Sequence, residues 1–142
     1  MKTSLENLAI DANVVLRYLL RDNDELFAKA KDIFAAIDNG SITVELDPVI
    51  LAEIIFVMQR VYKQSPADIA AVVLPLIQHE QIIVPDKERY LRALHLYADG
   101  LAHFGDACAC AAAIERCGGQ LLSFDRDLSK IPEVVRRENI GQ

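Results

Sequence analysis

The chain has 142 residues, of which 52% are hydrophobic and 25% charged, and this balance is typical of a single globular domain over residues 1–142. Its formal net charge of −6 argues against a protein that holds nucleic acid through a broadly basic surface, but it does not exclude nucleic acid as a substrate. The first residues lack the apolar stretch of a signal peptide and no apolar run approaches the roughly 18 residues that span a bilayer, so we expect a cytoplasmic protein without membrane contact.

Short β-like runs alternate with longer helical segments along the chain. The expected strands are short and rich in branched apolar residues, and they cover 8–10, 41–45, 81–84 and 120–123. The expected helices cover 14–20, 25–38, 48–62, 66–78, 87–99 and 106–117. The last few residues, 138–142, offer a further edge strand. This alternation predicts an α/β domain around a mainly parallel sheet.

Capping residues mark several of these helix ends. Asp47-Pro48 and Ser65-Pro66 each combine an N-cap residue with proline at the first helical position. Asn39-Gly40 and Gly118-Gly119 are expected to end the helices before them, because glycine tolerates the left-handed turn that closes a helix. Pro75 should kink the helix 66–78.

One charged residue interrupts the apolar helix 48–62. Glu53 lies within the run 49–58, which is otherwise almost entirely apolar, as expected of a helix that is packed on several sides. An unpaired buried carboxylate is costly. We therefore expect Glu53 to be buried beside a compensating partner such as a cation or a metal ion.

Three further acids stand where α/β proteins place their ligand sites. Asp11 directly follows the first expected strand, Asp125 follows the fourth, and Asp106 opens the helix 106–117. Because sites in open α/β sheets lie at the carboxyl ends of the strands, right-handed crossovers should bring these acids and Glu53 to one crevice. Carboxylate oxygens suit Mg²⁺ or Mn²⁺, which activate water for phosphodiester hydrolysis.

Each aspartate also has an ordinary structural interpretation. Asp11 is equally well placed to cap the helix 14–20, and Asp106 to cap the helix 106–117. Asp125 is also a typical turn residue. For these three residues the metal-ligand and structural interpretations both stay open.

Several neighbouring polar residues are ambiguous in the same way. Asn13 and Ser123 lie two positions from a predicted ligand, where they either orient its carboxylate or serve as turn and capping residues. Asp127 competes as a fourth ligand, although a solvated turn explains it better. Arg17 is one of several cations that could contact phosphates, but scattered surface cations are the commoner explanation. The three cysteines, an odd number in one alanine-rich segment, are expected to be small reduced core residues.

Four segments in order resemble the PIN-domain nucleases, and among them the small VapC-like toxins of toxin–antitoxin pairs. They are the opening D-x-N segment 10–19, Leu51-Ala52-Glu53, Phe104-Gly105-Asp106-Ala107 and the segment 122–128. The resemblance implies a three-layer α/β/α fold and metal-dependent cleavage of RNA. It also implies that Asp11, Glu53, Asp106 and Asp125 are the metal-site acids, supported by Asn13 and Ser123. Family members often have threonine where this chain has Ser123, which retains the hydroxyl.

The resemblance further implies partners and a biological role. Family members are commonly homodimers or higher oligomers, and the toxins are neutralised by a small VapB-like antitoxin whose C-terminal segment binds along the active-site groove. The leading interpretation is thus an endoribonuclease toxin that uses Mg²⁺ or Mn²⁺. The alternatives are a solitary PIN nuclease in RNA processing, a PIN-like binding module without useful turnover and, less well supported, a flavodoxin-like receiver or small-molecule domain.

Overall fold

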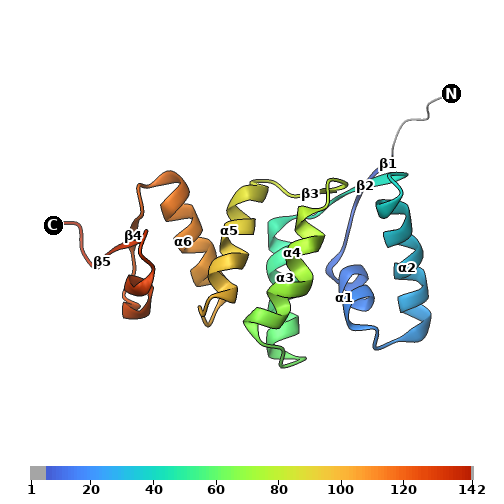
Figure 1. Ribbon diagram of the computed structural model, residues 1–142, viewed down its shortest axis with the longest axis horizontal. Helices are drawn as coiled ribbons and strands as arrows, with labels where there is room; N and C mark the ends of the chain where they lie inside the picture. Colours follow the sequence, from blue (N-terminus) through green and yellow to red (C-terminus); the bar gives the residue numbers. More distant parts are fainter. Residues whose placement is uncertain (1–5, 142) are drawn as a thin grey trace.

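The computed structural model describes residues 6–141 as six helices, five short strands and one 3₁₀ helix (Figure 1). The elements are β1 (Glu6–Ala9), α1 (Ala12–Leu20), α2 (Asp24–Asp38), β2 (Ile42–Glu45), α3 (Pro48–Arg60), α4 (Pro66–Gln78), β3 (Ile82–Ile83), α5 (Lys87–Ala98), α6 (Phe104–Arg116), β4 (Gln120–Leu122), η1 (Arg126–Lys130) and β5 (Val135–Arg137). Among these residues, no helix is both long and apolar enough to cross a bilayer.

The predicted helices and strands are confirmed to within a few residues, and the caps explain why. The side chain of Asp47 accepts a 2.8 Å hydrogen bond from the Val49 N–H, and that of Ser65 accepts one of 3.1 Å from the Asp68 N–H. Each bond satisfies a donor that the first turn of a helix leaves free. The last strand, β5, forms before the segment 138–142 in which an edge strand was expected.

All strand pairing is parallel, which confirms the predicted α/β class and agrees with a PIN-like α/β/α fold. The strands nevertheless form two sheets among the described residues. In the first, β2 lies between β1 and β3, with Leu8 opposite Val44 and Val44 opposite Ile82. In the second, β4 pairs only with β5, with Leu121 opposite Arg136.

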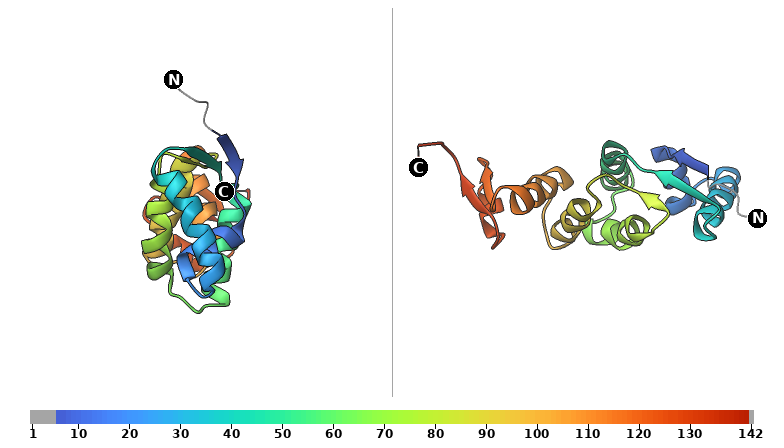
Figure 2. Two further views of the ribbon diagram at one scale, coloured as in Figure 1. Left: turned by 90° about the vertical axis from the view of Figure 1, so that its right-hand side faces the viewer. Right: turned by 90° about the horizontal axis from the view of Figure 1, so that it is seen from above.

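The two sheets lie at opposite ends of an elongated molecule. In Figure 1, β1–β3 with α1 and α2 occupy one end, β4 and β5 occupy the other, and α3–α6 lie between them. The view from above in Figure 2 shows the same order along the long axis. Strands β1 and β4 are therefore well separated within one chain.

Most of the buried apolar side chains form one core that runs from α1 to the first half of α6. Its largest fully buried member is Tyr97 of α5, whose ring meets that of Phe104 edge to face at 5.7 Å between centroids. A smaller cluster under β4 and β5 joins α6 to the loop between these strands, and consists of Cys110, Leu128, Ile131 and Val134. Helix α6 therefore contributes one face to each cluster.

Candidate active site

Asp11 lies at the carboxyl end of β1, as predicted. It is exposed, and its Oδ1 accepts a 2.7 Å hydrogen bond from the Ala12 N–H, so it also caps α1. A shallow pocket of about 490 Å³ surrounds it at the ends of the three-stranded sheet, where Glu45 and Asp47 are further acids. The capping interpretation of Asp11 is confirmed, and the carboxylate still faces a pocket.

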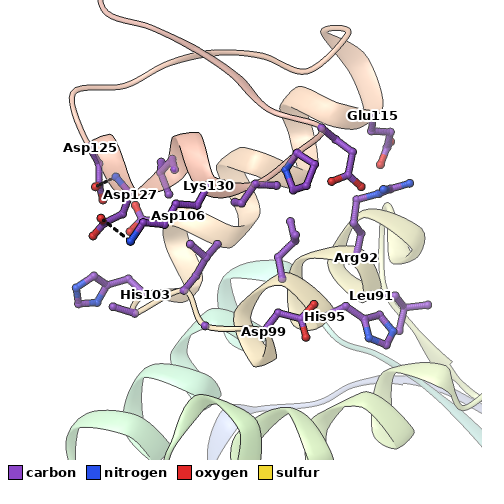
Figure 3. A pocket seen from close by; sticks show the side chains of 18 of the residues that line it. Leu91, Arg92, His95, Asp99, His103, Asp106, Glu115, Asp125, Asp127 and Lys130 are labelled. Carbon is purple, nitrogen blue, oxygen red and sulfur yellow. Dashed lines mark hydrogen bonds and ion pairs between the residues drawn. The ribbon is translucent and has the colours of Figure 1, made fainter.

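Asp106 and Asp125 lie together at the other end of the molecule. Both line a cleft of about 1060 Å³ between α5, the start of α6 and the β4–β5 loop. Figure 3 shows them at one end of this cleft, beside Asp127 and Lys130. The structure thus brings two of the four predicted acids to one surface.

The local roles of these two acids differ. Asp106 lies in the first turn of α6 and is half-buried; it does not cap the helix, because His103 occupies the N-cap position. Asp125 does serve as a cap, since its Oδ1 accepts a 2.9 Å hydrogen bond from the Asp127 N–H at the start of η1. Together they affect a buried neighbour: desolvation, followed by the negative charges of Asp106 and Asp125, raises the pKa of the Cys110 thiol.

Asp127 shares the cleft with Asp106 and Asp125. Its Oδ1 lies 3.5 Å from Nζ of Lys130, and both side chains are exposed. His103, at the N-cap position of α6, lines the same cleft. Neither His103 nor Lys130 was predicted as a site residue, because the histidines have no metal-binding spacing and a lysine ammonium is not a metal ligand.

The predicted burial of Glu53 is wrong. Glu53 lies on an exposed stripe of α3 together with Val49 and Phe56, which are 73% and 56% exposed. The buried stripe of the same helix carries Leu51, Ile54, Ile55 and Met58. The apolar run misled the prediction because apolar side chains on the uncovered face were taken for core residues.

The two supporting residues are placed as turn and helix-start residues. Asn13 is exposed in the first turn of α1. The Ser123 hydroxyl accepts a 3.0 Å hydrogen bond from the Asp125 N–H, so it shapes the turn that carries this acid. Ser123 therefore acts on Asp125 through the backbone.

Arg136 is a positioning residue that the sequence did not reveal. Its guanidinium donates to the Ser123 carbonyl oxygen and to the Ser129 hydroxyl, both at 2.8 Å, and it pairs with Glu138 at 2.8 Å. These contacts fasten the turn around Asp125 to β5. Only the three-dimensional pairing of β4 with β5 identifies this role.

Arg17, a candidate phosphate contact, forms an ion pair with Asp22. Its guanidinium lies 2.7 Å from Oδ1 of Asp22, whose other oxygen accepts a 2.7 Å hydrogen bond from the Tyr62 hydroxyl. The Tyr62 hydrogen bond and the Arg17 charge lower the pKa of Asp22. This network ties α1 to the end of α3.

The acids do not form a cation site within one chain. Among residues 6–141, no group of three or more His, Cys, Asp or Glu side chains could hold a metal ion. Asp11 lines one pocket, Asp106 and Asp125 line the other, and Glu53 lines neither. A divalent cation therefore does not fit a single chain as folded here, and the expectation of one shared crevice is not met within that chain.

The PIN domain family matches residues 8–134. The chain belongs to this family. The match begins within β1 and ends at the residue before β5, so it includes β4 and all four acids but not β5. PIN-domain proteins are generally nucleases, and this membership makes phosphodiester hydrolysis the chemistry to test. No curated protein matches the chain.

Proposed function

We propose that this PIN-domain protein is an endoribonuclease that hydrolyses RNA phosphodiesters with Mg²⁺ or Mn²⁺. The observation that carries the proposal is that the four predicted acids, Asp11, Glu53, Asp106 and Asp125, have no cationic partner in the described part of the chain. None of them takes part in an ion pair among residues 6–141, although the same part of the chain forms nine other pairs. Three of these carboxylates, those of Asp11, Asp106 and Asp125, line pocket walls and offer the oxygen ligands that a hard cation takes, although one chain does not gather them at a single site.

Membership of the family supports the reaction, and the chain's charge bears on how RNA is bound. With a net charge of −6, the protein has no general attraction for a polyanion. RNA binding must then depend on local basic side chains and on the metal ion that the acids bind. We expect Mg²⁺ or Mn²⁺ to be required for RNA binding as well as for cleavage.

The same acids support a role in a toxin–antitoxin pair. A VapB-like antitoxin that places an arginine against Asp106 and Asp125 would pair with them bidentately and exclude the cation. This partner would bind along the cleft that both acids line. Its expected signature is an inhibited complex that regains nuclease activity when the antitoxin is removed.

The test is RNA cleavage by purified protein with and without Mg²⁺ or Mn²⁺. Asp11→Asn should lower cleavage more than about 100-fold, because loss of even an outer-shell metal partner costs about 10- to 100-fold. Asp32→Asn is the matched control, since Asp32 is an exposed acid on α2 outside both pockets. Circular dichroism should show that both variants keep the wild-type fold.

Two results would contradict the proposal. One is cleavage by Asp11→Asn at the wild-type rate, which would place the chemistry elsewhere. The other is a folded, metal-loaded protein that binds RNA or an antitoxin peptide tightly without cutting RNA, with affinity lost in Glu53→Gln. That second result would identify a PIN-like binding module.

A further inference from the structure

Among residues 6–141, strand β1 is paired along one edge only. Its partner is β2, and the Ile10 N–H donates a 3.1 Å hydrogen bond to the Glu45 carbonyl oxygen. Because alternate residues of a parallel strand bond to the same neighbour, the Ala9 N–H points to the unpaired side. All four residues of β1 are exposed, including Leu8, whereas strands of parallel sheets are normally buried on both faces.

Strand β4 is likewise paired along one edge only within the described part of the chain. Its partner is β5, and the Ser123 N–H donates a 3.0 Å hydrogen bond to the Arg137 carbonyl oxygen. The same alternation turns the Leu122 N–H to the unpaired side. Leu122 is 63% exposed and Phe124, just beyond the strand, is 84% exposed. Unpaired, apolar strand edges of this kind are templates for pairing with another chain.

The strand β4 of the same chain cannot cover β1 in this conformation. The two strands lie at opposite ends of the molecule in both Figure 1 and Figure 2. Helices α5 and α6, which lead into β4, are fixed by the main core through Leu94, Tyr97 and Ala107, all of them fully buried. A second copy can supply β4 without disturbing this core.

We propose that two copies of the chain exchange their C-terminal strands, so that β4 of each copy pairs with β1 of the other. Each half of the dimer then has one five-stranded parallel sheet, with β1 and β4 buried in its interior. The exposed apolar side chains of Leu8 in β1 and of Val49 and Phe56 in α3 belong to the N-terminal part of each copy, which would receive β4 of the other copy. The PIN match supports the pairing of β1 with β4, because it covers residues of both strands as parts of one domain.

Strand exchange has a consequence for the active site, and this part rests on the proposed function. Asp11 follows β1 and Asp125 follows β4, so pairing these strands brings the two acids to the same edge of one sheet. Asp106 and Asp125 of one copy would then complete the acid set begun by Asp11 and Glu53 of the other. The metal site that a single chain lacks would form between two chains.

The experiment is a mass measurement by sedimentation equilibrium, which does not depend on activity. Wild-type protein should have twice the 15.8 kDa chain mass. Ala9→Pro should yield monomers, because proline removes the N–H on the free edge of β1 while leaving the bonds to β2 intact. Phe124→Asp should also yield monomers, and it keeps the test decisive if Ala9→Pro fails to fold. Val72→Asp is the matched control on the exposed surface of α4, and it should remain dimeric.

Each outcome decides the proposal. Monomeric wild-type protein would overturn it, whether the chain stays open or closes on its own β4. A dimer that persists in folded Ala9→Pro and in Phe124→Asp would overturn it too, because the interface would lie elsewhere. A wild-type dimer that separates in both variants supports strand exchange, even if the protein proves unable to cut RNA.

Discussion

The Tyr97 hydroxyl donates a 2.7 Å hydrogen bond to Oε1 of Gln59, and this bond joins α5 to α3. The amide of Gln59 continues the link by donating to the Ala102 carbonyl oxygen at 2.9 Å, in the loop before α6. Desolvation raises the pKa of Tyr97, so the hydroxyl stays protonated as the donor. The two bonds link α3, α5 and the loop that leads to α6.

Tyr97→Phe should lower the free energy of unfolding by about 1 kcal/mol, the typical net contribution of one hydrogen bond. The loss should be modest because Gln59 is only half-buried and water can reach it. Urea unfolding monitored by circular dichroism measures the change. Tyr90→Phe is the control, since the Tyr90 hydroxyl has no hydrogen bond among the described residues. Equal effects of the two substitutions would contradict this role.

Gly119 should not tolerate a side chain. Its φ is +84°, and a Cβ there would lie 2.2 Å from the Glu133 carbonyl oxygen, in the connection that leads to β5. Gly119→Ala should therefore destabilise the protein by more than about 1 kcal/mol. Gly105→Ala, where a Cβ meets no atom within 4 Å, should be neutral or slightly stabilising. Equal urea midpoints for the two variants would contradict this prediction.

The stability of the protein should fall in alkaline solution. Burial raises the pKa of the Cys108 thiol from 9.0 to about 11, with partial opposition from Arg89. The unfolded chain therefore releases this proton first, so the contribution to stability is full below about pH 9 and is lost as the pH rises toward about 11. Cys108→Ala should reduce this loss, while substitution of the exposed Cys117 by alanine should leave it unchanged. Urea midpoints at about pH 8 and about pH 10 measure the difference.

The positions of most elements could be predicted from the sequence, because local chemistry determines them. Asp47-Pro48 and Ser65-Pro66 begin helices through hydrogen bonds within one turn, and the pattern of branched residues locates β2. The acids at the ends of β1 and β4 were predicted for the same reason. Each depends only on where one strand stops.

The joining of the elements could not be predicted in this way. Whether β4 lies beside β1, and in which chain, depends on contacts between residues more than 100 positions apart, which no local pattern specifies. The exposure of Glu53 was missed for a related reason. The apolar side chains of Val49 and Phe56 indicate that this face of α3 is covered. The sequence does not tell whether the same chain or another copy covers it, and the single chain leaves both side chains exposed.

Binding of Mn²⁺ should follow assembly. A single chain has no group of three acids that could hold the ion among its described residues. The proposed strand-exchanged dimer would bring Asp11 of one chain near Asp125 of the other. Calorimetric titration should show Mn²⁺ binding to the wild-type dimer and affinity reduced more than about tenfold in monomeric Phe124→Asp. Equal affinity in the two proteins would show that one chain suffices.

The most direct test of a nuclease site built from two chains is complementation between two inactive variants. Asp11→Asn and Asp125→Asn should each fail to cut RNA, but a mixture refolded together forms mixed dimers that contain one site with both acids intact. Random pairing should restore about a quarter of the wild-type activity, since half of the dimers are mixed and each has one of its two sites complete. Wild-type protein that cuts RNA while the refolded mixture stays inactive would contradict the shared site.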